Sequence, residues 1–175
     1  VSDAEAVHFH QDGPSEIDLL LRHQQEIDLK FEIQDLLTGQ RADPFLEAVR
    51  AYVQSGPNFD DSLLRPCPPK MKGDARHKRF QIDEHSNLLQ FVHPRTSKVL
   101  FVLPPAHRLA FMKHAHENMF PGLHAPPQTM AFELLHSGYY WPGYFKDCKW
   151  YAKTCHPCQL HAVKHGKVGK MKLYG

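Results

Sequence analysis

The chain has 175 residues, of which 42% are hydrophobic, so it can bury a core and is not disordered by composition. It holds no apolar run near the roughly 20 residues that a membrane-spanning helix needs. The formal charge of +2 conceals an asymmetry, because residues 1–61 carry thirteen acids against four Lys and Arg, whereas residues 137–175 carry one acid against seven Lys. This asymmetry predicts modules with different partners and favours nucleic acid as the partner of the basic end, although solubility alone explains the charges equally well.

Two acidic helices are predicted in the first third of the chain. After a leader over residues 1–15, apolar side chains recur at helical spacing and predict a helix that ends at Gly39. A second helix is predicted to begin at Pro44, with Asp43 as its N-cap, and to end at Gly56. The pair is interpreted as an acidic helical hairpin with an ordinary core face. Its apolar side chains are Ile17, Leu20, Leu21, Ile27, Phe31 and Ile33 or Leu36 in the first helix, and Phe45, Leu46, Val49 and Tyr52 in the second.

An irregular stretch and a small sheet follow. Residues 56–79 include the run RPCPPK, whose prolines oppose both helix and central strand, so a module boundary is expected here and Cys67 is expected to be a free thiol without a role. Apolar runs at residues 80–82, 88–92 and 99–103 predict an antiparallel sheet of two or three strands. Turns are expected at residues 84–87 and 94–97. A sheet of this size needs neighbouring helices to be stable.

Three helices are predicted after the sheet, each opened by proline in its first turn. The second is expected to be closed by Gly138 in the left-handed conformation. They begin at Pro104-Pro105, Pro126-Pro127 and Pro142, and end near His116, Gly138 and Thr154.

Four residues near these helices have the pattern of a zinc site. His116 and His124 precede Cys155 and Cys158 with the spacing H-x7-H-x30-C-x2-C. Zinc prefers thiolate and imidazole ligands, and a closed set of four indicates structural rather than catalytic zinc. A C-x-x-C pair alone does not identify a zinc site, because redox proteins also contain such pairs. The two histidines upstream favour the zinc site. The histidines that compete as ligands are His107, His114, His136, His156, His161 and His165.

Zinc would stabilise helices that bury too little surface to fold alone, because the free energy of metal binding then becomes free energy of folding. Aromatic side chains are expected to form the core beside the ion. They are Phe132, Tyr139, Tyr140, Trp141, Phe145 and Trp150.

This region resembles the HHCC zinc-binding N-terminal domain of retroelement integrases, and is most similar to gypsy-type long-terminal-repeat elements and to the gammaretroviral and spumaviral type. Residues 80–109 resemble the extension domain that precedes it, which is a small sheet. The chain departs from the family at Leu123-His124-Ala125, where the family usually has Gly-His-x-Gly, and at Gln128, where it often has Lys. The resemblance rests on Ala115-His116, His124, Thr129, Tyr140-Trp141-Pro142, Cys155, Cys158 and Gln159.

The predicted elements and the resemblance together indicate a mostly α fold with a small antiparallel β-sheet. A zinc-stabilised three-helix HHCC domain would follow a small α+β extension domain and an acidic helical lead-in. The expected limits are residues 1–61 for the lead-in, 62–104 for the β-rich extension, 105–160 for the zinc-binding domain and 161–175 for a basic tail or linker.

The implied function is that of a DNA-binding and multimerisation front end of an integrase, a nuclear protein without membrane attachment. It would bind double-stranded element ends and assemble with copies of itself or with other integrase domains. No enzymatic activity is expected, because the chain ends soon after Cys158 and leaves no room for a core with Asp, Asp and Glu. The expected DNA contacts are Gln128, Thr129, Lys146, Lys149, Lys153, Lys164, Lys167, Lys170 and Lys172.

Two other functions remain open. A domesticated host regulator with a two-histidine, two-cysteine zinc finger would discriminate strongly between duplex sequences. A protein-interaction module would bind itself or a host protein through helices 15–54, with the zinc domain as a scaffold. The lysines are equally well interpreted as a solvated face, and Thr129 alone is more simply a helix cap.

Overall fold

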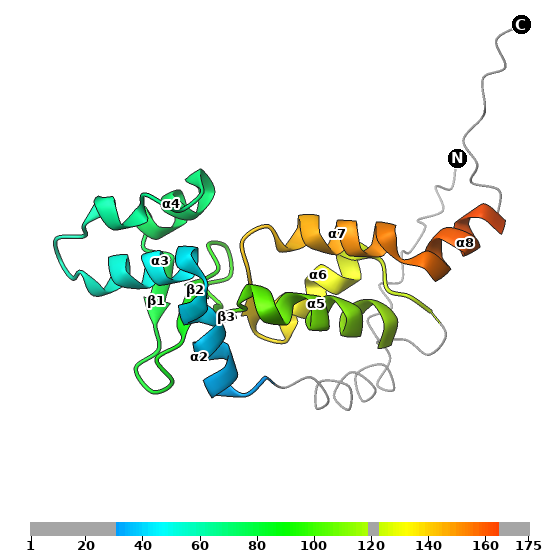
Figure 1. Cartoon of the computed structure of the whole chain (residues 1–175), viewed down its shortest axis with the longest axis horizontal. Coiled ribbons are helices and arrows are strands. Elements are labelled where there is room, and N and C mark those ends of the chain that lie inside the picture. Colours follow the sequence, from blue (N-terminus) through cyan, green and yellow to red (C-terminus); the bar gives the residue numbers. More distant parts are fainter. Residues whose placement is uncertain (1–30, 119–122, 165–175) are drawn as a thin grey trace, which may run out of the picture. The chain divides into compact units, whose positions relative to one another are not determined.

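The computed structural model describes residues 31–118 and 123–164. The predicted leader, most of the first predicted helix and the end of the basic tail lie outside these residues. Among the described residues, no helix combines the length and the apolarity that crossing a membrane requires. The helical elements are α2 (Ile33–Ala42), α3 (Pro44–Gln54), the 3-10 turn η1 (Asp61–Leu64), α4 (Pro69–Arg76), α5 (Pro105–Lys113), the π-helical turn η2 (His114–Asn118), α6 (Pro127–His136), α7 (Tyr144–Thr154) and α8 (His156–Lys164) (Figure 1).

The sheet has four strands in the order β1-β2-β3-β4, which are β1 (Phe80–Ile82), β2 (Leu89–Val92), β3 (Val99–Val102) and β4 (Tyr139–Tyr140). The first three are antiparallel, as predicted, and the turns between them contain Asn87 and Ser97 at positive φ. The fourth strand is parallel to β3 and comes from the YYW segment, far along the chain. The sheet therefore joins the predicted extension to the predicted zinc domain.

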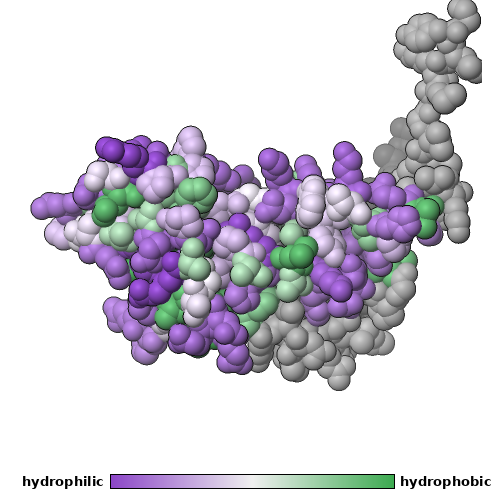
Figure 2. All heavy atoms as spheres, viewed as in Figure 1, coloured by the Kyte–Doolittle hydropathy of each residue, from purple (hydrophilic) through white to green (hydrophobic). Residues whose placement is uncertain are grey.

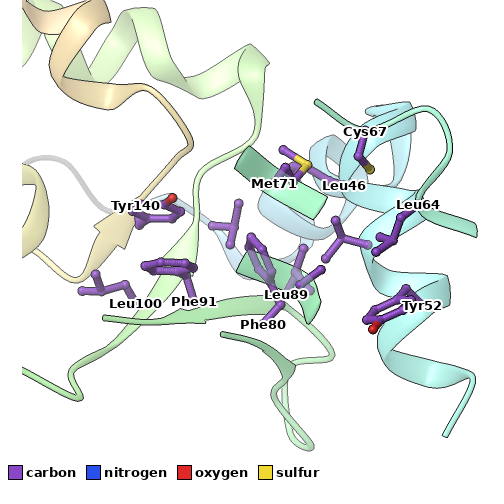
Figure 3. Packing of buried hydrophobic residues seen from close by; sticks show 13 residues of the cluster. Leu46, Tyr52, Leu64, Cys67, Met71, Phe80, Leu89, Phe91, Leu100 and Tyr140 are labelled. Atoms are coloured by element: carbon purple, nitrogen blue, oxygen red, sulfur yellow. The ribbon is translucent and has the colours of Figure 1, made fainter. Parts of the chain in front are cut away.

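One hydrophobic core covers this sheet (Figure 3). Leu46 from α3 and Leu64 from η1 belong to it together with Leu89 from β2. The ring of Tyr140 stacks on Phe91, with centroids 3.8 Å apart. Elements from both sides of the predicted boundary near residue 61 thus share a core with a residue of β4.

The prediction of irregular chain over residues 56–79 is wrong. The segment contains η1 and α4, and α4 begins at the last proline of the run. Pro69 occupies the first helical position, where a missing N–H costs nothing, so the prolines begin a helix here. Met71 is buried on its inner side, and Cys67 is only 3% exposed. Cys67 therefore contributes to the packing of the core.

The predicted helix end at Gly39 is also wrong, because α2 continues to Ala42. Gly39 instead lies against the chain that opens α5. A Cβ at this position would be 2.7 Å from Cγ of Pro104. The glycine allows the ring of Pro104 to pack closely against α2 and does not end the helix.

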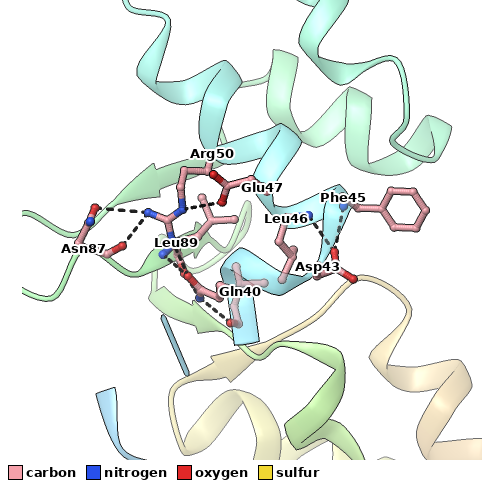
Figure 4. A network of polar contacts seen from close by, with 9 residues as sticks. Gln40, Asp43, Phe45, Leu46, Glu47, Arg50, Asn87 and Leu89 are labelled. Atoms are coloured by element: carbon pink, nitrogen blue, oxygen red, sulfur yellow. Dashed lines mark hydrogen bonds and ion pairs between the residues drawn. The ribbon is translucent and has the colours of Figure 1, made fainter. Parts of the chain in front are cut away.

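A buried polar network fastens α2 and α3 to the sheet (Figure 4). The amide of Gln40 donates to the carbonyl oxygens of Leu89 and Val102 at 3.1 and 2.7 Å. Its oxygen accepts from the N–H of Leu89 and from the guanidinium of Arg50 at 2.7 and 2.9 Å. Arg50 is 1% exposed and also donates to the carbonyl oxygen of Asn87. The network links two helices with β2 and β3.

Candidate metal centre

The four predicted zinc ligands come together in the structure. His116 lies on η2, His124 in the loop before α6, Cys155 between α7 and α8, and Cys158 in the first turn of α8. Their ligand atoms all lie within 4.8 Å of one another. Sγ of Cys158 is 3.4 Å from Nε2 of His116 and 3.3 Å from Nδ1 of His124, and Sγ of Cys155 is 3.2 Å from the same Nδ1.

These separations fit one tetrahedral zinc ion. Zinc–sulfur and zinc–nitrogen bonds of ordinary length place the two ligand atoms about 3.6 Å apart across a tetrahedron. Two thiolates would balance the charge of the ion, and two neutral imidazoles would complete the set. No ligand position is left for water or substrate, so the chemistry that zinc supplies here is structural.

Two hydrogen bonds between His116 and Ala125 orient the imidazole of His116. Nδ1 of His116 is 2.7 Å from the carbonyl oxygen of Ala125, which can only accept, so Nδ1 carries the proton and leaves Nε2 free for the metal. The N–H of Ala125 donates to the carbonyl oxygen of His116 at 2.8 Å. Ala125 is buried and is not among the positive-φ residues. Pro126 stands where the family usually has its second glycine, and its φ of −68° shows that the loop needs no glycine there.

Sequence reasoning missed a second contact beside the ligands. The hydroxyl of Tyr151 on α7 donates to Oε1 of Glu117 at 2.7 Å. The Tyr151 ring also meets the His116 ring edge to face, with centroids 5.5 Å apart. Burial and the Glu117 carboxylate raise the pKa of Tyr151, so it stays a donor. In the sequence, only position indicates that these two residues lie near the metal. Glu117 directly follows one ligand, and Tyr151 precedes Cys155 by one helical turn.

Protons compete with zinc for the sulfur of Cys158. Burial and the neighbouring sulfur of Cys155 raise the pKa of the Cys158 thiol. Zinc binds the thiolate, so loading requires loss of that proton, and a falling pH opposes it.

Within the described residues, the other histidines and cysteines are not part of the metal cluster. His156 is exposed between the two cysteines, and His114 is half-buried outside the cluster. Cys67 and Cys148 are buried free thiols. Burial raises the pKa of Cys148 to about 11, which makes it a poor ligand or nucleophile at neutral pH.

The predicted aromatic core is only partly right. Trp141 is fully buried, donates from Nε1 to the Asp147 carboxylate at 2.7 Å and meets the ring of Phe111 edge to face. The side chains of Phe132, Phe145 and Trp150 are 55%, 37% and 57% exposed, so their assignment to the core is wrong. Phe132 lies on α6, and Phe145 and Trp150 lie on α7.

The predicted DNA contacts that the structure describes lie on α6, α7 and α8. Gln128 is exposed and Thr129 half-buried in the first turn of α6, where no side chain caps the helix, so the capping interpretation of Thr129 is wrong. Lys146, Lys149 and Lys153 are exposed on α7. Lys164 ends α8, which extends past residue 161, where the tail was expected to begin. Lys167, Lys170 and Lys172 lie outside the described residues.

Comparison with known families agrees with this geometry. Residues 103–164 match the model of the integrase zinc binding domain. The match covers about a third of the 175 residues and contains α5 to α8 with all four ligands. Neither the comparison with curated proteins nor that with solved structures gave a match. Residues 103–164 are therefore an integrase-type zinc-binding domain, in which His116, His124, Cys155 and Cys158 hold a structural zinc ion.

Proposed function

We propose that the chain is the DNA-binding and multimerisation front end of a retroelement integrase. The observation that carries this proposal is the closed zinc centre, which ties η2 and the loop before α6 to the ends of α7 and α8. Such a centre fixes the positions of α6 and α7 while leaving their outward sides free. The integrase-type domain indicates an integrase-associated role, and we propose that this role is to bind DNA.

The charge distribution supports a DNA partner. Gln128 and Thr129 would meet the duplex at the start of α6, with the exposed lysines of α7 on its phosphates. The α6 N-terminus, with its partial positive charge, favours a phosphate in the same place. The protein would act in the nucleus, where its DNA partner is found.

The metal centre is the only group of three or more metal-ligating side chains within residues 31–118 and 123–164. In this proposal the chain binds DNA and assembles with other integrase domains. The joining of DNA strands is carried out by a core with three carboxylates elsewhere in the assembly. The proposed partners are double-stranded element ends, further copies of the chain and other integrase domains.

Duplex binding across a salt series tests the proposal. The zinc-loaded chain should bind a labelled duplex of the element end, with log K falling against log salt by about 0.9 for each phosphate that a lysine neutralises. Lys146→Gln should reduce that slope by about 0.9. Lys70→Gln, an exposed lysine on α4, is the matched control and should leave it unchanged.

The same titration separates the alternatives. Strong discrimination between one duplex sequence and random duplex would favour the host regulator. No duplex binding at any salt would contradict the proposal and favour the interaction module. Sedimentation with and without zinc tests multimerisation, which should require the loaded metal centre.

A further inference from the structure

The outward side of α7 carries three lysines bordered by two aromatic rings, and the metal centre uses none of them. Lys146, Lys149 and Lys153 are exposed, and so are Phe145 at 37% and Trp150 at 57%. At about 100° per residue, these side chains span about 140° of the helix surface, with the lysines between the rings. Figure 2 shows hydrophilic side chains projecting along this helix. We call these five residues the basic–aromatic face.

The charge of this face is uncompensated on its own helix. The one acid of α7, Asp147, lies on the opposite side, half-buried, and accepts from Trp141. Nζ of Lys149 lies 4.4 Å from the centroid of the Phe145 ring. This cation–π contact holds the ammonium group on the face. An anionic ligand would meet three cations and no carboxylate of α7.

The combination of groups discriminates between kinds of partner. Lysine is depleted in the buried centre of protein interfaces, so three lysines between two rings argue against a protein. An intact duplex offers phosphates to the lysines but keeps its base faces stacked, so the rings would have no partner. Unpaired nucleotides offer both phosphates and flat base faces, and cationic groups with aromatic platforms are the usual elements of single-strand binding sites.

We propose that the basic–aromatic face binds unpaired nucleotides of DNA, with Trp150 stacked on a base and the lysines on the phosphates. The inference rests on the proposed function and narrows it, because it assigns the strand state that α7 recognises. The lysines of α7 would then contact phosphates of either strand state, whereas the ring of Trp150 would bind only an unpaired base.

The two tryptophans of the chain make the test direct. Trp141 is fully buried and Trp150 is exposed, so their emission differs. Titration of the zinc-loaded full chain with a dT oligonucleotide of about 12 nucleotides should quench the exposed component. Trp150→Phe leaves only Trp141 and should abolish the quenching, while a phenyl ring keeps part of the affinity.

Affinity measurements then isolate the stacking. Trp150→Ala should weaken binding of the labelled oligonucleotide by about tenfold and change duplex binding by less than about twofold. Phe132→Ala removes an exposed ring from α6 and is the matched control, with no expected change. Lys149→Gln should lower the salt slope for the single strand by about 0.7.

Three results would overturn the inference. Binding of the oligonucleotide without quenching of Trp150 would exclude stacking, and equal weakening of duplex and single strand by Trp150→Ala would make the ring a duplex contact. Heparin competing as well as the oligonucleotide would show that charge alone is recognised. In each case retained duplex binding would leave the proposed function standing, whereas loss of all DNA binding would remove both.

Discussion

Tyr151 and Glu117 form a hydrogen bond directly beside the ligands of the metal centre. The hydrogen bond holds η2 against α7, and the ring of Tyr151 supports the imidazole of His116. Outer contacts of this kind orient metal ligands and typically change metal affinity by about 10- to 100-fold. We expect Tyr151→Phe to weaken zinc binding by about tenfold, measured by competition with a chromogenic chelator.

Tyr144→Phe is the matched control for this prediction. It removes a hydroxyl from the same helix, but its ring packs against Tyr140 rather than the ligands. Its zinc affinity should equal that of the wild type. An unchanged zinc affinity in Tyr151→Phe would mean that the hydroxyl has no positioning role. The zinc affinity of Glu117→Gln should then also equal that of the wild type.

The ligands themselves could be predicted from the sequence, because donor chemistry and spacing suffice to identify a zinc set. The Tyr151–Glu117 pair could not, since 34 positions separate the two residues and only the folded chain brings them together. The exposure of Trp150 was likewise beyond the sequence. A large aromatic side chain indicates burial on average, and only the packing of α7 decides which of its sides faces inward.

At the scale of elements, a substitution of Gly39 distinguishes the effect of close packing on stability from the effect of helix propensity. A methyl group there would meet Cγ of Pro104 at 2.7 Å, and a proline ring cannot rotate away. We expect Gly39→Ala to destabilise the protein by about 1–3 kcal/mol, although alanine is the better helix former. Gly73→Ala on α4 is the matched control, because no atom lies within 4 Å of its added Cβ. It should stabilise the protein by about 0.5–1 kcal/mol, so urea unfolding should give opposite signs.

Proline explains both the successes and the failures of the predicted elements. Pro105 and Pro127 begin α5 and α6, as predicted, whereas α7 begins two residues after Pro142 because Gly143 adopts a left-handed conformation between them. The α4 helix was missed because a proline run was interpreted as a linker. The β4 strand was missed because its partner in the sheet lies far away in sequence, and two residues show no periodicity.

Gln40 tests how strongly α2 is fastened to the sheet. Gln40→Ala would leave the N–H of Leu89 and the guanidinium of Arg50 buried without this partner. Unsatisfied buried groups cost about 1–3 kcal/mol each, so we expect a loss of about 3 kcal/mol in the free energy of unfolding. Gln34→Ala, an exposed glutamine on α2, should cost almost nothing. If the loss comes from stranded partners, Arg50→Met should recover part of it in the double variant.

For the whole molecule, zinc is expected to affect the sheet as well as the helices. Strand β4 belongs to the zinc-binding domain and pairs with β3, and Tyr140 is 4% exposed within the core of the sheet. Nζ of Lys98 also donates to the carbonyl oxygens of Leu135 and His136 at the end of α6. Loss of the metal would therefore remove a strand and a core ring from the sheet.

We expect chelation to lower helical circular dichroism and to shift the emission of the buried Trp141 to the red. The remaining helices and strands should stay folded but lose about 3 kcal/mol, the usual cost of removing a buried aromatic side chain from a core. Heating should then give one transition in each form, at a lower temperature and with a smaller loss of helical signal in the chelated protein. Cys158→Ser should behave like the chelated protein, whereas His156→Gln, an exposed residue between the two cysteines, should behave like the wild type. A chelated protein with unchanged Trp141 emission would show that the domain holds together without its metal, contrary to the small core that α5 to α8 can build alone.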